Sequence, residues 1–140
     1  MTAIRRLGVP ELAAALRAQA AGYYPHEAAV ELLIQHWSWL ARGDFLRRYV
    51  DYEDDPAVTG GEPMAGVRWK AAITALNTGR LPASAGEGVI LRIAASLYAG
   101  IPVDLRDLAR LDETNARLVT CAIWHCKGRR EVWTTTGVAS

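Results

Sequence analysis

The 140-residue chain has little lysine, little cysteine and almost no excess of charge of either sign. Only two of its sixteen basic residues are lysines, and its formal net charge is +1 at pH 7. This balance excludes a simple polycationic nucleic-acid binder. Its apolar runs fall well short of the roughly 18 to 20 residues that span a bilayer. The first residues are followed by an amphipathic run and do not resemble a secretion signal, so we expect a cytoplasmic protein without a membrane partner.

The two cysteines, Cys121 and Cys126, are five residues apart in a predicted helix. At that spacing their side chains point in different directions, so they cannot form a disulfide with each other. Two reduced thiols fit a reducing compartment such as the cytoplasm. Cys121 and His125 lie four residues apart and could share a metal ion on one helix face. No second ligand cluster exists in the sequence, and we therefore expect no metal and no cofactor.

Local motifs of common enzymes are also missing. The sequence has no glycine-rich phosphate loop, no HExxH and no dinucleotide fingerprint, and its Ser, His and Asp residues follow no known triad order. His36, beside Trp37, is expected to be a half-buried hydrogen-bonded side chain and not a catalytic base. We therefore expect no catalytic residue, although groups distant in sequence could still form an active site.

The residues that are abundant predict an all-α fold. Ala, Leu and Arg dominate, β-branched runs are scarce before the C-terminus, and Gly or Pro interrupts the chain at intervals. We expect a single compact helical domain over residues 1–128 and a short extended C-terminal tail over 129–140, in which 131–136 (EVWTTT) has strand character. The domain would hold about seven helices, with a loop at 54–63. These helices are 10–21, 25–41, one capped by Asp44, 63–77, 84–100, a short one after Asp104, and 112–128.

Two helix starts are indicated by their capping residues. Ser84 and Glu87 have the spacing of a capping box, in which each side chain satisfies a backbone donor of the first turn. Asp112 is placed to cap the last helix. Along that last helix, apolar residues at three- and four-residue spacing predict an inward stripe. This stripe consists of Ala116, Val119, Ile123 and Cys126.

Residues 104–127 resemble a helix-turn-helix in outline, which suggests DNA binding as an alternative function. The residues from Gly66 onward carry a net charge of +4, which also favours DNA binding. The exposed side of the second helix would then include Cys121 and Trp124, and acids border that side. The other interpretation is a helical hairpin that completes the core. The predicted DNA contacts are Arg106, Arg110, Thr114 and Arg117.

Aromatic residues are numerous, with five Trp and five Tyr. Trp37, Trp69 and Tyr98 have the spacing of core residues, whereas others fall off the apolar stripes. Large aromatics at exposed positions often anchor protein–protein contacts. An alternative is that they cover helix ends. The predicted protein contacts are Tyr23, Trp39, Trp124 and Trp133.

The segment EGVILRIAASLYAGIPVDLRDLARLDETNARLVTCAIWHCKG, with RWKAAITALNTGRLP before it, resembles small helical proteins of high-GC actinobacteria. The resemblance extends back through YYPHEAAVELLI and covers most of the chain. It implies no activity, cofactor or site. The expected function is therefore a non-catalytic cytoplasmic protein that acts through contacts with itself or with another protein. A DNA-binding regulator is the alternative.

Overall fold

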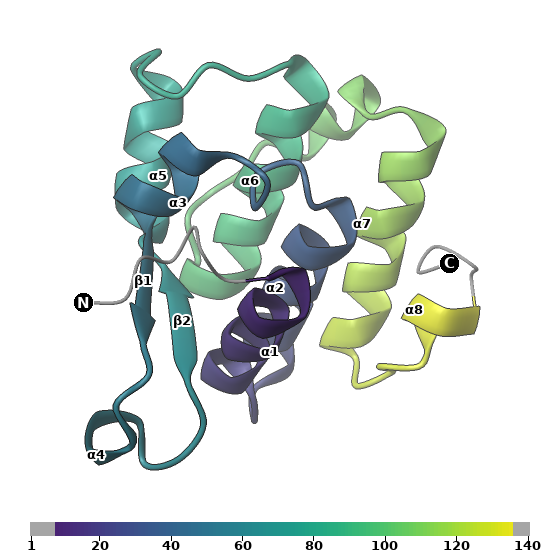
Figure 1. The fold of residues 1–140 in the computed structure, drawn as a ribbon. Coiled ribbons are helices and arrows are strands. Elements are labelled where there is room, and N and C mark those ends of the chain that lie inside the picture. Colours follow the sequence, from purple (N-terminus) through teal and green to yellow (C-terminus); the bar gives the residue numbers. More distant parts are fainter. Residues whose placement is uncertain (1–7, 136–140) are drawn as a thin grey trace.

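The computed structural model describes residues 8–135. This part of the chain contains nine helices, more than the seven or so expected, and one two-stranded sheet, so the fold is mostly helical as predicted but is not all-α. The elements, shown in Figure 1, are α1 (Val9–Ala20), α2 (Tyr24–His36), α3 (Gly43–Tyr49), β1 (Val50–Glu53), α4 (Pro56–Thr59), β2 (Met64–Val67), α5 (Trp69–Asn77), α6 (Ala85–Ala99), η2 (Leu105–Arg110), α7 (Glu113–Cys126) and α8 (Val132–Thr135).

Helix α2 forms the centre of the core, because it packs against both α6 and α7. Ala28 and Ala29 on α2 are completely buried, and side chains this small let neighbouring helices approach closely. Helix α1 packs against α2 and β2, and α5 packs against α6. A continuous cluster of buried apolar residues runs from α1 to α8. Within residues 8–135, no helix has the length and apolarity needed to cross a membrane.

The hairpin of β1 and β2 was not expected from the sequence. The strands are antiparallel, and their register pairs Val50 with Val67 and Glu53 with Met64. The helix predicted over 63–77 is therefore wrong in its first part, which is strand β2. Ala65 is buried and β2 packs against α1, and this tertiary packing favours the strand. The helix starts only at Trp69.

The helix starts predicted at Ser84, Asp104 and Asp112 are confirmed, whereas the predicted cap at Asp44 is wrong, because α3 begins at Gly43 with Arg42 at its N-cap. Both hydrogen bonds of the Ser84–Glu87 capping box are present, and Gly100 ends α6 with a φ of 70°. The side chains of Asp104 and Asp112 accept backbone hydrogen bonds at the starts of η2 and α7. The short helix after Asp104 is a 3-10 helix and not an α-helix.

Helix α2 ends at His36, five residues before the expected end at 41. Trp37 follows it with a φ of 66°, in the left-handed region that residues other than glycine rarely adopt. Its backbone N–H still donates to the Leu33 carbonyl, so the last turn of the helix is closed. The chain then turns back and places Trp39 in the core.

The C-terminal tail has no strand in its described part. Residues 132–135 form α8, so the expected strand character of 131–136 is wrong for these four residues, and Thr136 lies outside the described residues. Val132 and Trp133 are buried and belong to the core cluster. The hydroxyl and backbone N–H of Thr134 both donate to the Glu131 carbonyl, which favours a turn over an extended chain.

Candidate interaction surface

The four aromatic residues predicted as protein contacts divide into two pairs. Tyr23 and Trp124 are exposed, with 58% and 45% of their surface accessible. Trp39 and Trp133 are buried, so the expectation that they offer an exposed contact surface is wrong. Each of these two indoles has found an internal acceptor: Trp39 Nε1 donates to the Glu87 carbonyl at 2.9 Å, and Trp133 Nε1 donates to a histidine of α7.

The two exposed aromatics lie in different surroundings. The Tyr23 ring makes an edge contact with His26, which stacks on Tyr98 of α6 at 3.9 Å between ring centroids. Trp124 lies on α7, and the Arg129 guanidinium stands 5.1 Å above its ring. The contacts that Tyr23 and Trp124 make therefore do not join these two residues into one surface. Both remain predicted contact residues.

The inner face of α7 carries a partly buried hydrogen-bond network. His125 is only 4% exposed, and its Nε2 lies 3.0 Å from Glu27 Oε1 on α2. Trp133 Nε1 lies 2.9 Å from His125 Nδ1. An indole N–H can only donate, so Nδ1 accepts and Nε2 carries the proton that is donated to Glu27. Arg130 adds two hydrogen bonds to the Glu27 carboxylate, at 2.8 and 3.1 Å. We call these four residues the His125 network.

Hydrogen bonds stabilise the charged form of Glu27 in this network. Those from Arg130 contribute most, those from His125 and the Gly22 backbone N–H add to them, and together they lower the pKa of Glu27 to about 2, although burial opposes this shift. Both ring nitrogens of His125 are occupied by protein partners. The network therefore connects α2, α7 and α8, and it leaves no free histidine nitrogen for a metal or a substrate.

The sequence did not indicate this network, because Glu27 and His125 are 98 residues apart. The predicted inward stripe of α7 is consequently wrong at several positions. Ala116 and Ile123 are exposed, and Cys126 is only half-buried. The contacts made by α8 and Glu27 turn a different side of α7 inward. That buried side contains Leu118, Val119, Cys121, Ala122 and His125.

The opposite side of α7 is solvent-exposed along its whole length. Positions spaced by three and four residues share one side of a helix. Seven exposed residues have this spacing, and we call them the outer face of α7. They are Glu113, Ala116, Arg117, Thr120, Ile123, Trp124 and Lys127.

Polar groups on this outer face are largely paired within the helix itself. Arg117 Nη2 donates to Glu113 Oε1 at 2.7 Å, and the Thr120 hydroxyl donates to the Ala116 carbonyl at 2.9 Å. Ile123 is 56% exposed beside Trp124. The outer face therefore combines large exposed apolar side chains with polar groups that already have partners.

The residues predicted to contact DNA do not form an unpaired basic surface. Arg106 makes a bidentate pair with Asp104, Arg110 lies 4.0 Å from Asp107, and Arg117 pairs with Glu113. Thr114 is exposed, but Cys121, expected on the same side of the helix, is 2% exposed. In a helix-turn-helix the two helices pack on each other, whereas η2 packs mainly against α6. These contacts do not favour the DNA alternative, which stays a prediction.

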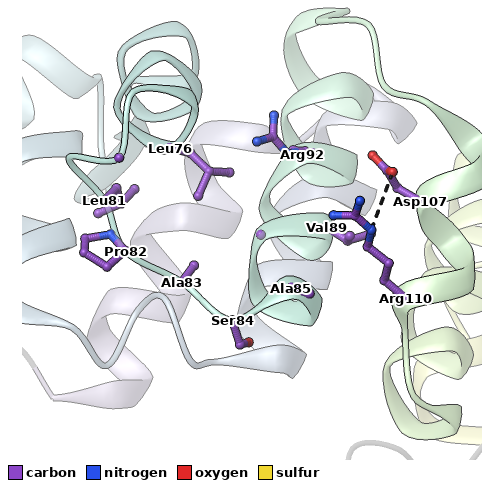
Figure 2. A pocket seen from close by; sticks show the side chains of 12 residues that line it. Leu76, Leu81, Pro82, Ala83, Ser84, Ala85, Val89, Arg92, Asp107 and Arg110 are labelled. Atoms are coloured by element: carbon purple, nitrogen blue, oxygen red, sulfur yellow. Dashed lines mark ion pairs between the residues drawn. The ribbon is translucent and has the colours of Figure 1, made fainter.

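A separate cavity of about 320 Å³ lies beside α6. Its walls come from the end of α5, the segment that leads into α6, α6 itself and η2 (Figure 2). Within residues 8–135, no three His, Cys, Asp or Glu side chains gather as metal ligands, and Cys121 and Cys126 form no disulfide.

Comparisons of this chain with protein-family models, with curated proteins and with solved structures gave no match. The functional argument therefore depends on the chain's own surfaces.

Proposed function

We propose that this protein is non-catalytic and self-associates, with two copies meeting through the outer face of α7. The observation that carries the proposal is the exposure of Ile123 and Trp124 side by side on a continuous helix face. A buried tryptophan contributes more to interfaces than most residues, because it removes a large apolar area from water. The expected cytoplasmic location is part of this proposal, and two cysteines that form no disulfide are consistent with it.

A second copy of α7 complements this face when the two helices run antiparallel across a two-fold axis at Thr120. In that arrangement Trp124 meets the small Ala116 of the partner, and Ile123 meets the aliphatic stem of the partner's Arg117. Glu113 at one end meets Lys127 of the other copy. Opposite charges therefore face each other at both ends of the contact.

The polar groups at the centre of this contact need no new partners. The Thr120 hydroxyl already donates to the Ala116 carbonyl, so closing the interface leaves this central donor paired. A pair of helices about 20 Å long, as expected for 14 residues, buries less area than a typical stable interface. We therefore expect a dimer that dissociates on dilution.

Sedimentation equilibrium from micromolar to submillimolar protein tests the proposal. We expect a monomer–dimer equilibrium, and Trp124→Ala should weaken it by at least about tenfold, because truncating a central interface tryptophan commonly costs that much. Leu105→Ala removes another exposed apolar side chain, 70% accessible and outside α7, and should leave the equilibrium unchanged. A strict monomer at all concentrations would contradict the proposal.

A charge exchange tests the antiparallel geometry. Glu113→Lys and Lys127→Glu should each weaken the dimer, because each places like charges opposite one another. The double variant should restore most of the lost affinity, because the pair between the two copies is then present with its signs reversed, while the Glu113–Arg117 pair within the helix stays broken. Thermal melting of all three variants shows whether they are folded. A dimer that loses affinity equally in the single and double variants would exclude this arrangement.

A further inference from the structure

The cavity beside α6 has an apolar floor. Leu81 and Val89 are 2% and 3% exposed, and the half-buried Leu76 of α5 stands across from α6. Gly88 belongs to the same wall, and a Cβ at that position would come within 3.9 Å of both Leu76 methyl carbons. The glycine therefore leaves this part of the floor open.

Two arginines line the same cavity. Arg92 extends from α6, and Arg110 reaches from η2 toward the side of α6 that carries Val89 (Figure 2). Arg110 lies 4.0 Å from Asp107, which also lines the cavity. Two guanidinium groups and one carboxylate give the cavity a net positive charge.

Arg92 differs from the other arginines of the described chain. Most of them make a hydrogen-bonded ion pair with an acidic residue, as Arg42 does with Asp44 and Arg68 does with Asp51. Arg47, Arg48 and Arg80 have no such pair but are exposed at the surface. Arg92 alone among the described arginines is half-buried and has no acidic partner. A guanidinium that is partly withdrawn from water without a counter-ion favours a bound anion.

We propose that this cavity binds a small organic anion, in which a carboxylate or another acidic group is attached to an apolar ring system. The acidic group pairs with Arg92, with Arg110 close by. The ring system lies on Leu76, Leu81 and Val89. The cavity volume of about 320 Å³ falls at the small end of the range for ligand pockets, which suits a ligand of one or two rings. This site is independent of the outer face of α7.

Two fluorescent probes of similar shape and different charge test the proposal. The anionic probe is 8-anilinonaphthalene-1-sulfonate, and its neutral analogue is N-phenyl-1-naphthylamine. We expect the anionic probe to bind the native protein with saturation. Arg92→Gln should weaken its binding by about tenfold, because a charge-assisted hydrogen bond is commonly worth that factor. Binding of the neutral probe should be the same in both proteins.

Two further variants locate the binding. Arg47→Gln removes an exposed arginine on α3 and should not change either probe's affinity. Ala83→Trp places a large ring at the exposed edge of the cavity and should reduce binding of both probes. Thermal melting establishes that each variant is folded. The proposal is overturned if the anionic probe does not bind the native protein, or if Arg92→Gln and Arg47→Gln weaken its binding equally.

Discussion

The two faces of α7 differ in where their polar groups find partners. On the inner face, His125 is held by Glu27 of α2 and Trp133 of α8, residues brought to it by the tertiary fold. On the outer face, Arg117 pairs with Glu113 one turn away in the same helix. The comparison teaches that one helix can stabilise the fold through one side and leave the other side available for a partner. Substitutions on the two faces should therefore have separable effects.

Removing the Trp133 side chain should have the largest effect on the stability of the fold. We expect Trp133→Ala to lower the free energy of unfolding by about 3 to 5 kcal/mol, because the variant loses a buried ring and leaves His125 Nδ1 without its donor. Urea denaturation at pH 7 measures this change. On the outer face, Trp124→Ala should change stability by no more than about 0.5 kcal/mol. Equal losses in the two variants would contradict the division between the faces.

Neutralising Glu27 should have an intermediate effect on the stability of the fold. Glu27→Gln should cost about 2 kcal/mol at pH 7, because it removes the negative charge that faces Arg130 and turns one of the two acceptor oxygens into an amide donor. Its counterpart on the outer face is Glu113→Gln. That change breaks an ion pair exposed to solvent and should cost no more than about 0.5 kcal/mol.

The pH dependence of the Glu27 effect has a defined sign. The folded protein holds the pKa of Glu27 at about 2, below the value of 4.5 for an unperturbed glutamate. The contribution of the Glu27 charge to the free energy of unfolding is therefore fully present above pH 4.5 and is lost as the pH falls through about 2. The stability difference between the wild type and Glu27→Gln should shrink over this interval. A difference that is constant from pH 7 to pH 2 would show that the charge of Glu27 does not stabilise the fold.

The smallest expected effect concerns nucleic acid. We expect no binding of a labelled mixed-sequence DNA duplex by fluorescence anisotropy at about 50 or 200 mM salt, a range over which phosphate contacts weaken steeply. The predicted contact arginines already have acidic partners, so Arg117→Ala should make no difference. Salt-sensitive binding that Arg117→Ala weakens would instead favour a DNA-binding function for the outer face.

Local signals in the sequence predicted the starts of α6, η2 and α7. Ser84 with Glu87, and Asp112, satisfy backbone donors within three residues of themselves, so their role depends little on the rest of the fold. The hairpin depends on pairing Val50 with Val67, which no local pattern specifies. Its second strand was therefore included in the helix that follows.

Burial of the aromatic residues was also harder to predict, because it depends on tertiary contacts that no local pattern specifies. Trp39 is buried because the left-handed turn at Trp37 directs the chain back to α6, where Glu87 offers a carbonyl. Trp133 is buried because α8 folds onto α7. Of the four predicted contact residues, off-stripe spacing correctly indicated exposure for Tyr23 and Trp124.

The hairpin extends from the helical body, and α4 lies at its tip (Figure 1). Residues 53–63 are exposed apart from Thr59, which is half-buried, whereas β2 is held against α1. The tip is thus anchored firmly at its base and contributes little to the core. An epitope or a short peptide inserted after Gly60 would be displayed about as rigidly as the strands allow, and it would leave both α7 and the cavity beside α6 open to their partners.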